Sequence, residues 1–190
     1  MSEDAASGEE LLTRAMSGDT AAFAALVRDR QRSVYSLALR MLCDRQKAED
    51  LAQEVFLQLH RNLASIESAT HLAFWLRKVT VNRAIDRLRR EPKMEVLPLE
   101  AADTEADGPD NDRLDDDPLL VRRLRQLVNQ LPPAPRAVVL LRYQEDLDPT
   151  DIARTLSMSI NTVKSHLKRS LAVLRKGIDV ATADAVRSRT

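Results

Sequence analysis

Basic and small polar side chains recur at helical spacing near the end of the chain. Lys164, Ser165, Lys168 and Arg169 share one side of a 3.6-residue wheel. The other side carries an apolar stripe of Val163, Leu167, Leu171 and Leu174, which we expect to be buried. Lysine and arginine attract phosphates and reach guanine edges, and small hydroxyls contact backbone or bases. The pattern is typical of a helix that reads the DNA major groove; the alternative is a solvated amphipathic helix.

The residues before this stripe predict a helix-turn-helix. Asp148 suits an N-cap and Pro149 the first helical position, so we expect a helix to begin there. Residues 157–159 form the expected turn, and Ser159 caps the second helix. Residues 151–177 carry six lysines and arginines against a single Asp. Cap, turn and charge together favour DNA binding over a merely solvated helix.

A second basic segment, HLAFWLRKVTVNRAIDRLRR, spans residues 71–90. Its cationic and amide side chains are Arg77, Lys78, Asn82, Arg83, Arg87, Arg89 and Arg90. Such a helix can hold the phosphates of a nucleic acid strand. Trp75 could stack on a base, but its apolar neighbours at helical spacing favour a core position.

A third segment, AEDLAQEVFLQLHR at residues 48–61, combines one apolar side chain with polar ones on the face turned away from the expected core. These side chains are Asp50, Gln53, Glu54, Leu57 and Arg61. An apolar anchor with a polar rim suits a protein partner. An isolated exposed leucine, which proteins tolerate, is an equally good reading of Leu57.

Enzymatic chemistry has little support in the sequence. The chain has no glycine-rich phosphate loop and no metal-ligand motif, and its three histidines are scattered over expected helices. Cys43, the sole cysteine, is expected to be an inert buried thiol. The acidic run at residues 115–117 could hold a cation, but a solvated segment is the favoured reading. We therefore expect no catalytic, cofactor or metal site and no enzyme.

The composition predicts an all-α fold. Only four glycines and 3% aromatic residues disfavour a strand-rich protein. Apolar residues recur at helical spacing in a short helix that ends near Gly18 and in a long helix from about residue 20 to 42. Further helices are expected over 47–63, 70–90 and about 120–131, with three more after Pro133.

The charge is divided unevenly along the chain. The net charge is zero overall, but it is +1 over residues 1–91, −8 over residues 92–117 and +7 over residues 118–190. We therefore expect two small helical domains, at 9–91 and 118–177, joined by an acidic flexible linker at 92–117 and followed by a tail at 178–190. The linker could screen the basic domain from DNA. The sequence has no apolar run of about 18 residues and begins with acidic residues, so we expect a cytoplasmic protein without membrane insertion.

Three segments resemble a known family. LPPAPRAVVLLRYQEDLDPTDIA, residues 131–153, together with the following helix resembles the region-four helix-turn-helix of sigma factors. Residues 48–61 resemble the region-two helix that docks on RNA polymerase, and residues 71–90 resemble the segment that melts and reads the minus 10 element. Both regions in this order, without another domain between them, resemble extracytoplasmic-function (ECF) sigma factors of the sigma-70 family. Ser157 stands where the family often has glycine.

The resemblance implies roles for the residues singled out above. It implies a sigma factor that directs transcription initiation, with the clamp and flap of core RNA polymerase, promoter DNA and an anti-sigma factor as partners. It assigns the minus 35 element to Asn161, Thr162, Lys164, Ser165, Lys168 and Arg169, the minus 10 element to the seven side chains of residues 71–90, and the polymerase clamp to the surface of residues 48–61. It also implies that the loop at residues 62–69 captures a flipped base. The remaining alternative is a stand-alone helix-turn-helix regulator that does not bind polymerase.

Overall fold

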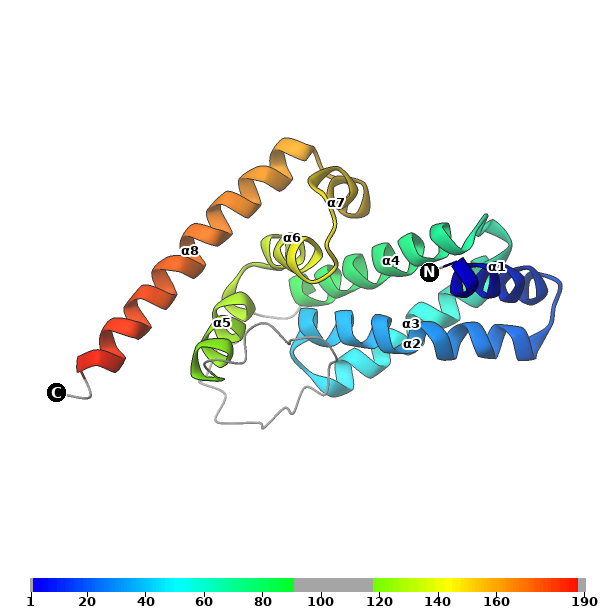
Figure 1. Cartoon of the computed structure of the whole chain (residues 1–190), viewed down its shortest axis with the longest axis horizontal. Helices are drawn as coiled ribbons and strands as arrows, with labels where there is room; N and C mark the ends of the chain where they lie inside the picture. The colour runs from blue at the N-terminus through cyan, green and yellow to red at the C-terminus, as the bar shows by residue number, and fades with distance from the viewer. Residues whose placement is uncertain (1, 91–117, 188–190) are drawn as a thin grey trace. The chain divides into compact units, whose positions relative to one another are not determined.

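The protein is described here by a computed structural model, which gives the backbone of residues 2–90 and 118–187 and the side chains of residues 8–90 and 119–179 (Figure 1). Within these residues the chain forms helices and connecting loops and no strand, which confirms the expected all-α fold. The chain divides into two compact units, Met1–Asp86 and Arg87–Thr190. The expected linker at 92–117 lies outside the described residues.

The N-terminal unit contains α1 (Ser2–Met16), α2 (Thr20–Leu42), α3 (Arg45–Asn62), the 3-10 helix η1 (Leu63–Ser65) and all but the last turn of α4 (Ala69–Arg90). Helices α1 and α3 pack against α2 (Figure 1). The core comes from one stripe of each helix and includes Leu26, Leu37, Met41, Leu51, Val55, Leu59, Leu72, Leu76 and Val81. Burying each of these larger side chains contributes about 1.5–3 kcal/mol, so the amphipathic pattern accounts for the packing.

Caps fix the ends of α2 and α3. The Asp19 carboxylate accepts hydrogen bonds from the backbone N–H groups of Ala21 (2.9 Å) and Ala22 (3.0 Å), and Gly18 before it has a φ of +90°. Asp44 accepts from the Lys47 N–H at 3.0 Å, so α3 begins at Arg45, two residues before the expected start. The break at Gly18 is a local signal, which is why the start of α2 was predicted closely, whereas the Asp44 cap of α3 was not used in the sequence prediction.

Cys43 is exposed, so the expectation of a buried thiol was wrong. Cys43 ends α2 in the left-handed conformation, with a φ of 56°, and its N–H donates to the Leu39 carbonyl at 2.8 Å. The reversal of the backbone takes its side chain off the buried stripe that ends with Met41 and Leu42.

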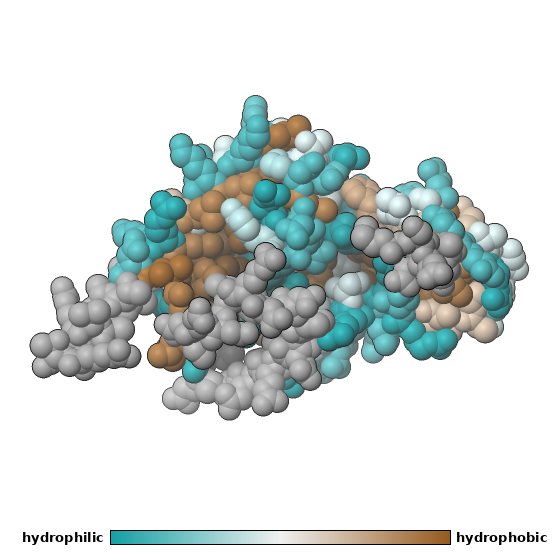
Figure 2. Space-filling model, viewed as in Figure 1, coloured by the Kyte–Doolittle hydropathy of each residue, from teal (hydrophilic) through white to brown (hydrophobic). Residues whose placement is uncertain are grey.

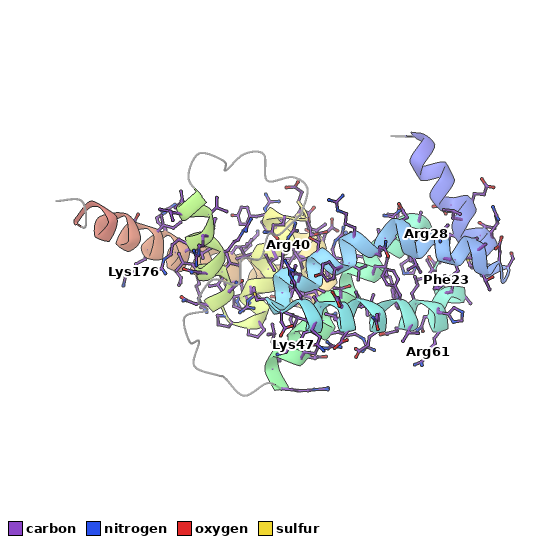
Figure 3. All side chains as sticks on the ribbon, turned by 90° about the horizontal axis from the view of Figure 1, so that it is seen from below. Phe23, Arg28, Arg40, Lys47, Arg61 and Lys176 are labelled. Atoms are coloured by element: carbon purple, nitrogen blue, oxygen red, sulfur yellow. The ribbon has the colours of Figure 1, made fainter. Side chains whose placement is uncertain are left out.

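The α2 and α3 pair is antiparallel, so residues distant in sequence meet along it. Phe23 of α2 and His60 of α3 pack edge to face with ring centroids 5.1 Å apart. Figure 3 shows Phe23 and Arg61 at one end of the pair and Arg40 and Lys47 near the turn at the other end. The face of α3 opposite α2 is thereby left for the polar residues considered below.

The C-terminal unit contains α5 (Pro118–Gln130), α6 (Pro133–Tyr143), α7 (Pro149–Leu156) and α8 (Ile160–Arg187). Helix α8 packs against all three of the others. Leu127, Leu131, Val139 and Leu174 form a buried cluster between α5, α6 and α8. Residues 178–187, expected to be part of a tail, continue α8.

Arg136 is a buried cation that ties α6 to the end of α5. Its side chain is only 8% exposed, and its Nη2 donates to the carbonyl oxygens of Asn129 and, at 3.2 Å, of Leu131. The last carbonyls of a helix have no intrahelical partner, and a cation is favourable there because of the helix dipole. Arg136 therefore supplies hydrogen bonds that the α5 backbone cannot make for itself.

Candidate nucleic-acid and partner interfaces

The turn between α7 and α8 fixes where α8 begins. Asp148 caps α7 by accepting from the N–H groups of Thr150 (2.7 Å) and Asp151 (2.8 Å), as predicted. Ser157 ends α7 in the left-handed conformation, with a φ of 52°, where the family often has glycine. Ser159 Oγ accepts from the Thr162 N–H at 3.1 Å, so α8 starts at the predicted residue.

The outward face of α8 carries the residues expected to read DNA. All six are exposed: Asn161, Thr162, Lys164, Ser165, Lys168 and Arg169. Val163 and Leu174 point the other way and are 0% and 6% exposed. The Thr162 hydroxyl is 2.8 Å from the Ser159 hydroxyl, so it takes part in the cap as well as facing solvent. The arrangement presents three cations along little more than one turn of helix.

The apolar side of α8 differs from the expectation at two positions, because Leu167 is only half-buried and Leu171 is exposed. Leu171 is 40% exposed and Ser170 is only 3% exposed. In a helix with 3.6 residues per turn, residues separated alternately by four and three positions lie on the same face. Positions 163, 167, 170 and 174 therefore face the core, and Leu171 lies at the edge of that face. Figure 2 shows apolar side chains gathered along part of the helix, and Ile160 and Val173 are also exposed.

Helix α4 carries the second basic set. Arg89 and Arg90 are exposed, whereas Arg77, Lys78, Asn82, Arg83 and Arg87 are half-buried. Lys78 Nζ lies 5.9 Å from the centre of the Phe74 ring, a cation–π arrangement. Trp75 is half-buried beside the buried Leu72 and Leu76, so its expected core position is only partly attained.

Arg83 is turned toward α3. Its Nη1 lies 2.9 Å from Glu54 Oε2 in an ion pair, and its Nε donates to Gln58 Oε1 at 2.8 Å. Glu54 was expected on the partner surface and Arg83 on the strand-binding surface. The structure brings these two together, and Gln58, which the sequence did not single out, joins them.

The outward face of α3 contains the expected partner surface. Asp50, Gln53, Leu57 and Arg61 are exposed, and Glu54 is half-buried because of its contact with Arg83. Leu57 is 60% exposed; Gln53, Glu54 and Arg61 lie about one turn from it, and Asp50 lies two turns away. The geometry therefore offers an apolar contact point ringed by charges and amides.

The loop between α3 and α4 is held at several points. Leu63 and Ile66 are 8% and 1% exposed, while Ala64, Ser65 and Glu67 face solvent. The Ser68 hydroxyl accepts from the His71 N–H at 3.0 Å, and the Glu67 N–H donates to His71 Nδ1 at 3.2 Å. The exposed loop residues thus lie between positions that are held by burial or by hydrogen bonds.

Arg14 and Asp19 form an ion pair at the turn between α1 and α2. Hydrogen bonds from the Ala22 N–H and from Arg14 hold the pKa of Asp19 below its ordinary value, and the same pair raises the pKa of Arg14. Arg14 Nη2 lies 2.7 Å from Asp19 Oδ2.

The described side chains include no group of three His, Cys, Asp or Glu residues able to hold a metal ion. No helix in the described ranges is both long and apolar enough to span a bilayer.

An all-helical protein with a capped helix-turn-helix and an exposed basic face on its second helix belongs to the helix-turn-helix class. Comparison with known proteins narrows the class. Residues 26–93 match the family Sigma-70 region 2, and residues 121–174 match Sigma-70, region 4.

Two relatives match over most of their length. The ECF RNA polymerase sigma factor SigW of Bacillus subtilis is 32% identical over 172 residues, 84% of this chain and 90% of SigW. The RNA polymerase sigma-H factor of Pseudomonas aeruginosa is 30% identical over 188 residues, 93% of this chain and 96% of that protein. The chain belongs to the ECF sigma factors of the sigma-70 family, which are initiation factors of RNA polymerase rather than enzymes.

A solved structure shares the fold. The sigma factor RpoE in complex with the anti-sigma factor NepR, from Bartonella quintana, matches with a TM-score of 0.62 and 18% identity. The match covers 83% of this chain and 97% of the matched chain. At this identity the likeness is one of fold.

Proposed function

We propose that this chain binds core RNA polymerase and directs it to promoters by recognising the minus 35 and minus 10 elements. The observation that carries the proposal is the capped helix-turn-helix with Lys164, Lys168 and Arg169 exposed on α8, in a chain that also carries region 2. A sigma factor needs both: one surface that holds polymerase and others that hold promoter DNA.

Helix α8 enters the major groove of the minus 35 element in this proposal. Exposed lysine and arginine side chains contact phosphates or guanine edges, and Ser165 contacts either. Asn161 and Thr162 lie at the start of α8, where backbone N–H groups also favour phosphate. The buried residues of the same helix keep this face outward.

Helix α4 and the loop before it hold the opened minus 10 strand. Arg77, Lys78, Asn82, Arg87, Arg89 and Arg90 contribute a basic surface for phosphates, and the exposed loop residues 64, 65 and 67 receive a flipped base. Arg83 contributes mainly through its contact with α3. The two units are separate DNA-binding domains, at about 9–91 and 118–177, with the linker setting their spacing.

The outward face of α3 docks on the polymerase clamp, with Leu57 as the apolar anchor and Asp50, Gln53, Glu54 and Arg61 around it. The C-terminal unit contacts the polymerase flap. We place this activity in the cytoplasm, and we include an anti-sigma factor as a partner because the structurally similar RpoE was solved in complex with the anti-sigma factor NepR.

Binding to core polymerase tests the proposal. The wild-type chain should bind purified core polymerase, and the holoenzyme should transcribe from promoters that core alone ignores. Leu57→Ala should weaken binding to core by about 10-fold, the cost of losing a buried apolar anchor. Met16→Ala is the matched control, since Met16 is also an exposed large apolar residue of the N-terminal unit, at 47%.

Failure of the wild-type chain to bind core would contradict the proposal. Equal binding to promoter duplex with and without core polymerase would instead identify a stand-alone helix-turn-helix regulator. Equal losses from Leu57→Ala and Met16→Ala would remove Leu57 from the docking surface.

A further inference from the structure

The first turn of α4 depends on a residue from α1. The first N–H groups of a helix have no intrahelical acceptor, so each needs a partner from elsewhere. The Ala69 N–H donates to Glu9 Oε1 at 2.8 Å, across a sequence separation of 60 residues. The His71 N–H is satisfied locally by Ser68.

Close packing places Glu9 there. A Cβ atom added to Gly8 would lie 3.6 Å from the Ala69 Cβ, an ordinary contact distance, so α1 passes directly beside the start of α4. Helix α1 also packs against η1. The Glu9 carboxylate is therefore brought to the positive end of the α4 dipole, where an anion is favourable.

The loop before α4 is short enough for this cap to govern its position. Leu63 and Ile66 anchor it from below, and the Glu67 N–H is tied to His71 Nδ1 in the first turn of α4. Glu9 holds the residue that follows Ser68. Between these points Ala64, Ser65 and Glu67 are exposed, so they are the residues available to contact a base in the proposed function.

We propose that Glu9 is a positioning residue for the base-capture loop at residues 62–69, and that it thereby increases the base preference at the minus 10 element. The inference rests on the proposed function of this loop. A flipped base is distinguished by contacts of fixed geometry, so a loop that shifts accepts more than one base. Glu9 lies before residues 26–93, the segment that matches region 2, so the family match alone does not assign it this role.

The experiment compares Glu9→Ala and Glu9→Gln with the wild-type chain. Glu9→Gln keeps an oxygen that can accept from the Ala69 N–H, whereas Glu9→Ala removes it. Glu10→Ala is the matched control, because Glu10 is an exposed carboxylate on the same helix that interacts with Arg14.

Two measurements separate the effect of Glu9 on the start of α4 from its effect on base recognition. Amide hydrogen exchange of the free chain reports the cap directly; Glu9→Ala should speed exchange of the Ala69 N–H by about fivefold, the factor that corresponds to the loss of about 1 kcal/mol typical of a helix cap. Holoenzymes reconstituted with each variant are then given single-stranded minus 10 oligonucleotides, selected with the wild-type holoenzyme and varied one base at a time.

Glu9→Ala should lower the preference for the best base at one position by about two- to fivefold, with binding to core polymerase unchanged. Glu9→Gln should restore most of that preference, and Glu10→Ala should match the wild type. Unchanged exchange at Ala69, or faster exchange with unchanged base preference, would overturn the inference. A wild-type holoenzyme without any base preference in the minus 10 strand would instead overturn the proposed role of the loop.

Discussion

Arg83 connects two surfaces that the sequence treats separately. It lies in the basic segment expected to bind DNA, yet its guanidinium is held by Glu54 and Gln58 of α3. A guanidinium with two acceptors in fixed positions is a poor candidate for a mobile phosphate contact. We infer that Arg83 sets how α4 is attached to the docking helix.

A double-mutant cycle of Gln58→Ala and Arg83→Ala tests this attachment. We expect a coupling of about 0.5 kcal/mol in the free energy of unfolding, since the pair is only partly buried. We also expect Gln58→Ala to reproduce most of the loss in minus 10 strand binding caused by Arg83→Ala. Arg32→Ala is the control, because Arg32 is an exposed cation of α2 outside the proposed strand-binding surface. Strand binding that depends on Arg83 and is indifferent to Gln58 would show a direct phosphate contact.

Asp19 makes the junction of α1 and α2 sensitive to acid. Its pKa is lowered first by the hydrogen bond from the Ala22 N–H and then by Arg14. A lowered pKa means that the carboxylate stabilises the folded state fully above its ordinary pKa, and that this contribution is lost as the pH falls through the lowered value.

Urea unfolding as a function of pH measures this contribution. The wild type should be more stable than Asp19→Asn at neutral pH, and the difference should shrink as the solution becomes acidic. Asp86→Asn, which changes an exposed carboxylate within α4, serves as the comparison. A difference between wild type and Asp19→Asn that stays constant down to strongly acidic pH would contradict the assignment.

At the scale of elements, α5 and α8 meet at a glycine. A Cβ on Gly177 would lie 2.5 Å from Leu127 Cδ2 and 3.2 Å from Leu127 Cγ, both too close. Leu127 is only 6% exposed and has little room to move within its cluster. Glycine lets the two helices approach, although within a helix it costs about 1 kcal/mol relative to alanine.

Gly177→Ala should therefore destabilise the C-terminal unit by roughly 1 kcal/mol, because the strain of overpacking exceeds the gain in helix propensity. Gly8→Ala is the matched control in α1: its Cβ meets only an ordinary contact, so it should be neutral or stabilising. Chemical denaturation followed by circular dichroism measures both. Equal stabilisation by the two substitutions would show that α5 and α8 adjust without strain.

The elements were predictable where their signals are local. Asp148 with Pro149, and Ser159, placed the starts of α7 and α8 because a cap acts within three residues of itself. The exposed face of α8 followed from its periodicity for the same reason. The exposure of Leu171 could not be predicted in this way. Whether position 170 or position 171 is buried depends on where the neighbouring helices pack, which the periodicity of α8 does not contain.

The contacts that hold the candidate site together could not be predicted from local sequence patterns. Arg83 meets Glu54 across 29 residues and Ala69 meets Glu9 across 60, and each involves a type of residue that is abundant on any helix surface. The burial prediction for Cys43 was wrong because Cys43 itself adopts the left-handed conformation that ends α2. Glycine is the usual sign of such a helix end in a sequence, and this position has none.

For the molecule as a whole, a net charge of zero conceals a division of charge that suits DNA binding. Residues 118–190 carry a net +7 and residues 92–117 a net −8. Local cations release counterions from DNA whatever the sum over the chain. The overall charge therefore underestimates the affinity of the C-terminal unit for duplex DNA.

Salt dependence measures this directly. If Lys164, Lys168 and Arg169 each neutralise a phosphate, the logarithm of the affinity of the holoenzyme for a minus 35 duplex should fall against the logarithm of the salt concentration with a slope of about −3 from these contacts. Lys164→Ala should reduce the slope by about 1, and Lys176→Ala, farther along the same helix, should leave it unchanged. A slope that is indifferent to Lys164 would remove that residue from the interface.

Helix α8 is both the scaffold of the C-terminal unit and the surface that it shows to the outside. Its inner positions are committed to α5, α6 and α7, and its outer positions carry no share of that packing. The two sets of residues can therefore change independently in evolution. New binding preferences can arise by exchanging a few outer side chains, with the framework beneath them inherited intact.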